Sequence, residues 1–187
     1  MSRLVYILPM LFFAVLAFGF FVALRTGEQA LPSTLIGKEP RPFDLAVLND
    51  AGAVDADTRL ASADLRSDGV TVVNFWASWC GPCKIEHPQL MALRNQPGVT
   101  LYGIDYKDDP ADAQAFLSEH GNPFARIGFD GTGRAGVDWG ITGVPETFIL
   151  DRAGRVRYKH TGPIMPGDME RFVLPAIRAA ATAPPGD

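Results

Sequence analysis

The apolar residues of this chain form segments typical of strands and segments typical of helices. Short runs rich in β-branched and aromatic residues predict strands, at residues 43–47, 70–75, 99–106, 124–129, 147–150 and 156–160. Helices are predicted between them and at the end, after residue 80, at 111–120, near 135–139 and at 168–180, with a turn or short helix at 60–66. Because strands and helices alternate, the sequence predicts an α/β protein, with a mixed sheet that carries helices on both faces. The last two strands are predicted to form an antiparallel hairpin.

Several details of this pattern can be checked against a structure. Residues 70–75 are apolar enough to be buried on both faces of the sheet, which predicts the central strand. In the helix after Cys80 we expect Pro88 to produce a kink or a break and His87 to be exposed, without a catalytic role. The side chains expected to pack this helix are Ile85, Leu90, Met91 and Leu93. Asp168 is expected to cap the last helix.

An uncharged run rich in Leu, Phe, Val and Ala occupies residues 4–24. As a helix it would measure about 31 Å, close to the thickness of the hydrocarbon core of a bilayer. A cleaved signal peptide usually has a shorter apolar stretch and a small-residue cleavage site, and residues 25–28 (Arg-Thr-Gly-Glu) offer no such site. We therefore predict an uncleaved, single-pass membrane anchor. Arg3 and Arg25 flank the run almost symmetrically, so charge alone leaves its orientation open.

Length and charge complete the picture of the domain organisation. The 187 residues suit one domain and an extra segment. The predicted parts are an anchor at 1–25, a linker with several Gly and Pro residues at 26–42, a domain at 43–180 and a tail at 181–187. The formal net charge of −4 argues against a surface that binds nucleic acid.

The only two cysteines, Cys80 and Cys83, are separated by Gly-Pro and follow the predicted central strand closely. A strand, then Cys-x-x-Cys, then a helix places Cys80 at a helix N-terminus. Free N–H groups and the helix dipole stabilise a thiolate there, and the thiolate is the nucleophilic form of cysteine. Cys83, one turn further into the helix, is expected to be the resolving thiol that closes the disulfide. The pattern predicts thiol–disulfide exchange.

Other uses of the cysteine pair fit the sequence less well. An inert bridge would close too short a loop to remove much chain entropy. A zinc site would lack half of its ligands, because the chain has no second Cys pair and its three histidines are scattered. A copper carrier that uses both thiols and the distant His160 stays open, because soft sulfur ligands suit Cu(I).

Residues 75–84 (Phe-Trp-Ala-Ser-Trp-Cys-Gly-Pro-Cys-Lys) resemble the active-site segment of the thioredoxin superfamily. Three further segments narrow the resemblance to the CcmG/DsbE family: Glu-His-Pro at 86–88, a Gly-rich stretch ending in Trp-Gly at 130–140, and Gly-Val-Pro-Glu-Thr-Phe at 143–148. Members of this family are membrane-anchored, periplasmic, thioredoxin-like proteins of cytochrome c maturation. The resemblance covers residues 36–180 and the anchor, and it implies a thioredoxin-like fold.

The resemblance also implies a substrate-binding site beside the cysteines. Pro145 stands at the entry of an apolar strand, which is a natural place for a cis peptide bond. In thioredoxin-like proteins the corresponding proline is cis and faces the dithiol. The backbone beside it, at Val144 and Glu146, is then expected to pair with an extended substrate segment. Trp79 is expected to be an exposed contact for partners, and Trp76 to pack under the loop.

One position departs from general thioredoxins, which carry a buried Asp where this chain has Asn74. An Asn side chain cannot act as an acid or a base. Glu86 lies three residues after Cys83, on the same helix face, and Glu146 follows the predicted cis-proline. We hypothesise that one or both carboxylates handle the proton of Cys83. The alternatives are a solvated helix carboxylate for Glu86 and a partner-binding loop residue for Glu146.

The resemblance further implies a location, a substrate and a partner. A domain in the periplasm, tethered to the inner membrane, would reduce oxidised apocytochrome c, whose Cys-x-x-Cys-His site must be a dithiol before haem attachment. A membrane electron donor of the DsbD/CcdA kind would re-reduce it, within the cytochrome c maturation machinery. No organic cofactor and no metal is required. Two other functions stay open: a general extracytoplasmic reductant resembling TlpA or ResA, or even a net oxidant, and a Cu(I)-binding assembly chaperone.

Overall fold

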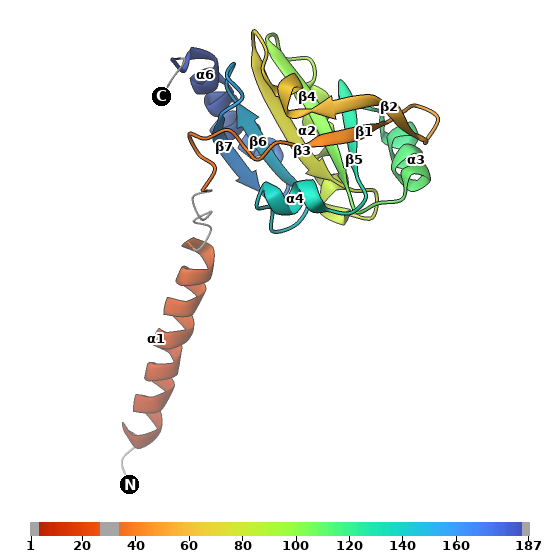
Figure 1. The fold of residues 1–187 in the computed structure, drawn as a ribbon. Helices are drawn as coiled ribbons and strands as arrows, with labels where there is room; N and C mark the ends of the chain where they lie inside the picture. Colours follow the sequence, from red (N-terminus) through yellow and green to blue (C-terminus); the bar gives the residue numbers. More distant parts are fainter. Residues whose placement is uncertain (1–3, 27–33, 185–187) are drawn as a thin grey trace. The chain divides into compact units, whose positions relative to one another are not determined.

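The computed structural model of the chain describes residues 4–26 and 34–184. The chain divides into two compact units, residues 1–31 and 32–187. The first unit contains the helix α1 (Leu4–Thr26), at the place of the predicted anchor (Figure 1). Among the described residues, no helix has both the length and the apolar character needed to span a membrane. Parts of the predicted anchor, linker and tail lie outside the described residues, at 1–3, 27–33 and 185–187.

The second unit is built on one mixed sheet. Its strands, in the part of the chain that the structure describes, are β1 (Asp44–Leu48), β2 (Val54–Ala61), β3 (Val70–Trp76), β4 (Val99–Tyr106), β5 (Arg126–Asp130), β6 (Glu146–Leu150) and β7 (Val156–Thr161). They lie in the order β2-β1-β5-β4-β3-β6-β7 (Figure 1). The pairs β3–β4 and β4–β5 are parallel and the other pairs are antiparallel. The predicted mixed sheet and its C-terminal hairpin are confirmed.

Helices cover both faces of this sheet, as the sequence predicts. On one face α2 (Gly81–Leu93), α3 (Pro110–His120) and α6 (Leu174–Thr182) contribute to one buried apolar cluster. On the other face a second cluster includes Trp139, directly after α4 (Arg134–Asp138), and Leu65 of the 3₁₀ turn η1 (Ser62–Leu65). The short helix α5 (Pro166–Asp168) and the π-helical turn η2 (Met169–Val173) lead into α6. The architecture is thioredoxin-like.

Strand β3 is the central strand that its apolar run predicts. All seven of its residues are buried. Because side chains alternate along a strand, Val72 and Trp76 pack in the cluster under α2, whereas Val73 and Phe75 pack in the cluster on the opposite face. The strand is therefore packed on both of its faces, directly before the loop at residues 77–80.

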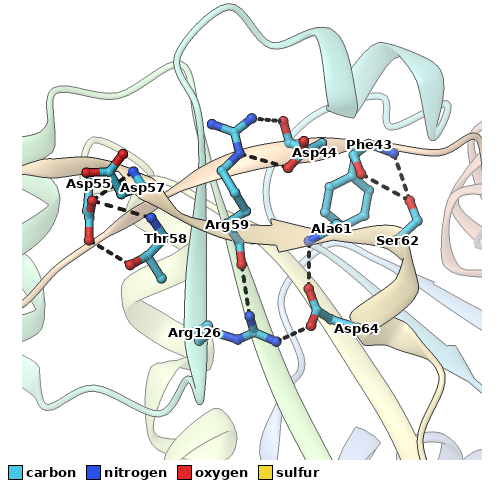
Figure 2. Close-up of polar contacts among 10 residues, drawn as sticks. All are labelled: Phe43, Asp44, Asp55, Asp57, Thr58, Arg59, Ala61, Ser62, Asp64 and Arg126. Carbon is cyan, nitrogen blue, oxygen red and sulfur yellow. Dashed lines mark hydrogen bonds and ion pairs between the residues drawn. The ribbon is translucent and has the colours of Figure 1, made fainter.

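Strand β2 was not predicted, because its only large apolar residues are Val54 and Leu60. Its burial pattern is mostly exposed or intermediate, which suits an edge strand. Polar contacts hold the antiparallel pair of β1 and β2 in place (Figure 2). Arg59 Nε donates to Asp44 Oδ1 at 2.8 Å. Arg126 of β5 forms an ion pair with Asp64 and donates to the carbonyl of Arg59. The predicted turn or short helix at 60–66 is correct only for η1, since residues 60–61 end the strand.

Two predictions about helices differ in detail from the structure. Of the kink or break expected at Pro88, the break is absent, because α2 continues through this residue. Both Pro88 and Lys84, whose carbonyl loses its intrahelical donor, lie on the exposed side, where water can satisfy that carbonyl. Asp168 does not cap the last helix from outside. The helical segment begins after Met165, and the Asp168 side chain reaches back to accept from the Met165 N–H at 3.0 Å.

The buried face of α2 includes Leu90 and Leu93, as predicted, but not Ile85. Ile85 is 55% exposed, whereas Cys83, Glu86, His87, Leu90 and Leu93 are buried. This buried set has the spacing of one helix face, i, i+3, i+4 and i+7. Two polar residues, Glu86 and His87, thus lie in the core beside Cys83.

Candidate active site

The two cysteines form a disulfide at the N-terminus of α2. Cys80 is the N-cap residue, and its Sγ accepts the backbone N–H of Cys83 at 3.1 Å. Pro82 occupies the first turn, where its missing N–H costs no intrahelical hydrogen bond. A sulfur at this position receives both the free N–H groups and the positive end of the helix dipole, which stabilise a thiolate once the bond is reduced.

The predicted cis peptide bond lies beside this disulfide. The bond between Val144 and Pro145 is cis, and the carbonyl oxygen of Val144 lies 3.5 Å from Cys80 Sγ. Val144 packs against the core without being fully buried. The two segments that the sequence singles out, residues 79–83 and 143–148, therefore meet in the folded protein.

Glu86 is completely buried one helical turn after Cys83. Its Oε1 accepts from Asn74 Nδ2 at 2.8 Å, and its Oε2 accepts from the backbone N–H of Ile164 at 2.9 Å. Burial raises the pKa of Glu86 to about 7, against the lowering effect of these two hydrogen bonds. The alternative of a solvated helix carboxylate is therefore wrong.

Glu86 and Cys83 line the same narrow hollow between α2, β3 and α3, together with the aromatic side chains of Trp76, Phe116 and Phe124. Asn74 extends the polar contacts across the sheet, since its Nδ2 also donates to Thr147 Oγ1 at 3.0 Å. A carboxyl group with a pKa near neutrality beside a buried thiol is suited to take up and return a proton.

Glu146 lies on a different side of the sheet from Glu86. Its neighbour Thr147 contacts Asn74 on the α2 face, and successive side chains of a strand point to opposite faces. Glu146 accepts from Thr142 through both the backbone N–H, at 3.0 Å, and the hydroxyl, at 2.7 Å. It also forms a buried ion pair with Lys159 at 2.7 Å. These contacts hold the loop that leads into Pro145.

The two tryptophans near the disulfide lie as the sequence predicts. Trp79 is 59% exposed, and its Nε1 donates to the carbonyl of Lys107 at 3.0 Å. Trp76 is buried, stacks on Phe124 and lies beside Phe116. The site thus has one exposed aromatic side chain on its rim and another that supports it from within.

The expectation that His87 is exposed is wrong. Its ring is buried between α2 and α3, packed edge-on against Phe116, with Nε2 at 2.9 Å from the Gly121 carbonyl oxygen. Burial lowers the pKa of His87. His87 therefore joins the two helices as a neutral side chain.

Metal binding would need several His, Cys, Asp or Glu side chains close together, and His160 is the candidate ligand that the sequence offers beside the cysteines. Among the described residues no group of three or more His, Cys, Asp or Glu side chains is placed to hold a metal ion. Both ring nitrogens of His160 have other neighbours: Nδ1 lies 3.3 Å from Tyr158 Oη and Nε2 lies 3.4 Å from the Pro163 carbonyl oxygen.

Sequence reasoning missed the loop after β4 that contacts the site, residues 107–109. Asp108 accepts from the backbone N–H and the hydroxyl of Ser78, and so fixes the residue two positions before Cys80. The available signal was the run of polar residues at the carboxyl end of β4, because parallel neighbours β3 and β4 end at the same edge of the sheet.

Fold and site together define a thioredoxin-like thiol:disulfide oxidoreductase. Comparison with known proteins agrees: the family model described as Redoxin matches residues 30–172. The chain is 38% identical to the thiol:disulfide interchange protein HelX of Rhodobacter capsulatus, over 97% of this chain and 99% of that protein. It is 41% identical to a DsbE homolog of Paracoccus denitrificans, over 94% of this chain and 97% of that protein.

A solved structure supports the same assignment. The crystal structure of a putative thiol:disulfide interchange protein DsbE from Chlorobium tepidum superposes with a TM-score of 0.62 at 28% identity, covering 76% of this chain and 95% of that one. The chain belongs to the Redoxin family and, within it, to the DsbE thiol:disulfide interchange proteins.

Proposed function

We propose that this protein is a membrane-anchored reductant outside the cytoplasm whose substrate is the disulfide of oxidised apocytochrome c. The observation that carries the chemical part of the proposal is the placement of Cys80 at a helix N-terminus beside the Val144–Pro145 segment, with Cys83 and the buried Glu86 lining one hollow behind it. The substrate part is supported by the resemblance to the CcmG/DsbE family and by the relatives named for thiol:disulfide interchange.

The first step is attack by the Cys80 thiolate on one sulfur of the substrate disulfide. A mixed disulfide forms between Cys80 and that sulfur, and the other substrate sulfur leaves as a thiolate that takes up a proton. An extended substrate segment lies along the backbone beside Pro145, where strand addition places its disulfide against Cys80. Trp79, exposed on the rim, contacts the same segment.

The second step is attack by Cys83 on the Sγ of Cys80. The mixed disulfide breaks, the Cys80–Cys83 bond forms, and the substrate leaves as a dithiol, so two electrons pass from protein to substrate. Cys83 must lose its proton to attack. In our proposal Glu86 accepts that proton, because it lines the same hollow and has a pKa near neutrality. Glu146 serves instead to hold the loop before Pro145.

The location and the electron donor follow from the same resemblance. The uncharged run at residues 4–24 anchors the domain in the inner membrane, with the domain in the periplasm. A membrane donor of the DsbD/CcdA kind returns two electrons to the Cys80–Cys83 disulfide. Tethering raises the effective concentration of the domain near such membrane partners.

Replacing Cys83 with Ala tests the proposed substrate and donor in the membrane-bound protein. The variant keeps the attacking thiol and lacks the resolving one, so the mixed disulfide is expected to persist. Diagonal electrophoresis and mass spectrometry should then recover apocytochromes c and a DsbD/CcdA-type carrier linked to Cys80. The double variant Cys80→Ala/Cys83→Ala is the matched control. Recovery of a broad set of secreted proteins without cytochromes would contradict the proposed substrate and leave the thiol chemistry intact.

A further inference from the structure

Asp105 is a buried acid that the steps above do not use. It lies near the end of β4, in register with Trp76 of β3, and none of its surface is exposed. Among the described residues neither of its carboxyl oxygens meets a hydrogen-bond donor. The neighbouring side chain that raises the pKa of Asp105 most is another acid, Asp108.

Asp108 is committed to the loop that carries the cysteines. One of its oxygens accepts the backbone N–H of Ser78, and the other accepts the Ser78 hydroxyl at 2.8 Å and the backbone N–H of Asp109 at 2.9 Å. Next to it, the carbonyl of Lys107 accepts the indole N–H of Trp79. The loop at 107–109 thus fixes Ser78 and Trp79, the two residues before Cys80.

Two carboxyl groups can share a hydrogen bond only if one of them carries a proton. Asp108 accepts donors with both oxygens, as a carboxylate does, and is less buried than Asp105. We propose that Asp105 retains its proton, donates it in a hydrogen bond to Asp108, and so acts as a positioning residue for the backbone that leads into Cys80. This inference concerns the exchange reaction itself and holds whichever disulfide is the substrate.

The charges around Asp105 agree with this assignment. The acids that face it are Asp108 and Asp109 from the loop after β4 and Asp130 from the end of β5. Burial, followed by these negative neighbours, raises the pKa of Asp105 to about 9. At neutral pH Asp105 therefore keeps its proton. Ionisation of Asp105 at alkaline pH would place two charges side by side and break the contact that supports Ser78.

Titration of the oxidised protein by NMR tests the proposal, because cysteines in a disulfide do not titrate. With ¹³C-labelled aspartate carboxyls, Asp105 is expected to ionise near pH 9. The indole N–H resonance of Trp79 should shift in the same range. In Asp105→Asn that shift should disappear, whereas the control Asp112→Asn, at an exposed site on α3, should keep it. Ionisation of Asp105 below pH 6, or a Trp79 resonance that does not change near pH 9 in the unaltered protein, would overturn the proposal.

The rate of attack by Cys80 gives a second, functional readout. An Asn amide can donate to Asp108 as the protonated acid does, whereas an Ala side chain cannot. At pH 7 we expect Asp105→Ala to slow the reaction of Cys80 with Ellman's reagent by about tenfold, and Asp105→Asn to stay within about twofold of the unaltered rate. Equal loss in both variants would contradict the donor role. If Asp105→Ala does not fold, the NMR titrations of the unaltered protein and of Asp105→Asn still decide.

Discussion

Replacing Cys80 with Ser is expected to lower the rate of disulfide reduction by about 1,000-fold or more, since a serine hydroxyl does not form a nucleophilic anion near neutral pH. Cys80 occupies the N-cap of α2, where its Sγ accepts the Cys83 N–H. Serine is itself a good N-cap residue, so the helix should remain intact. The effect is therefore expected in the chemistry rather than in the stability of the fold.

The matched replacement of Cys83 with Ser separates the two steps. Cys80 can still attack, so one equivalent of thionitrobenzoate should be released from Ellman's reagent and the second should not follow. The measurement is stopped-flow absorbance of the reduced variants. A Cys80→Ser variant that still releases thionitrobenzoate as fast as the unaltered protein would show that Cys83 is the attacking thiol, in contradiction to the assignment made from the helix N-terminus.

Replacing Glu86 with Gln is expected to slow the second step by about 100-fold at pH 7, the size of effect usual for general base catalysis. In the unaltered protein the second release of thionitrobenzoate should accelerate as pH rises through about 7, where Glu86 loses its proton and can accept that of Cys83. The variant should lack this acceleration. The control is Glu119→Gln, whose side chain is 78% exposed on α3. An unchanged pH profile in Glu86→Gln would remove Glu86 from the mechanism.

The same variant should alter the pH dependence of stability. Burial raises the pKa of Glu86 from 4.5 to about 7, so between these values the folded protein binds more protons than the unfolded chain. The free energy of unfolding therefore falls as pH rises through this range, by about 3 kcal/mol for such a shift. The measurement is urea unfolding of the oxidised proteins from pH 4 to pH 8. The free energy of unfolding of the unaltered protein should fall over this range relative to that of Glu86→Gln.

Much of the fold can be predicted because its central elements are strongly apolar. Residues 70–75 are buried from both sides, which leaves a continuous apolar run in the sequence, and β3 is found there. Strand β2 has no such run. It is an edge strand held by Arg59, Asp44 and Arg126, whose charges are also compatible with a turn. The strand has only two large apolar side chains, Val54 and Leu60, which are too few to mark it as a strand in the sequence.

The site divides in a similar way. The disulfide and the cis-proline are predicted because each is encoded in a short local motif. The burial of Glu86 and His87 depends on which face α2 turns to the sheet, and apolar Ile85 favoured the wrong face. Cys83 and Leu90 lie on the face that is buried. Glu86 and His87 share that face by helical spacing, which was the sign in the sequence that they are buried too. The contact between Ser78 and Asp108 depends on how β3 and β4 align, which the sequence alone does not give.

The central claim is that Cys80 and Cys83 reduce the disulfide of apocytochrome c. The most direct measurement is stopped-flow kinetics of the reduced protein with oxidised apocytochrome c, alongside insulin, whose disulfides have no Cys-x-x-Cys-His site. We expect apocytochrome c to be reduced at least about tenfold faster than insulin, with formation of the Cys80–Cys83 disulfide. Equal rates for the two proteins, or net transfer of the disulfide from this protein to reduced apocytochrome c, would contradict the claim.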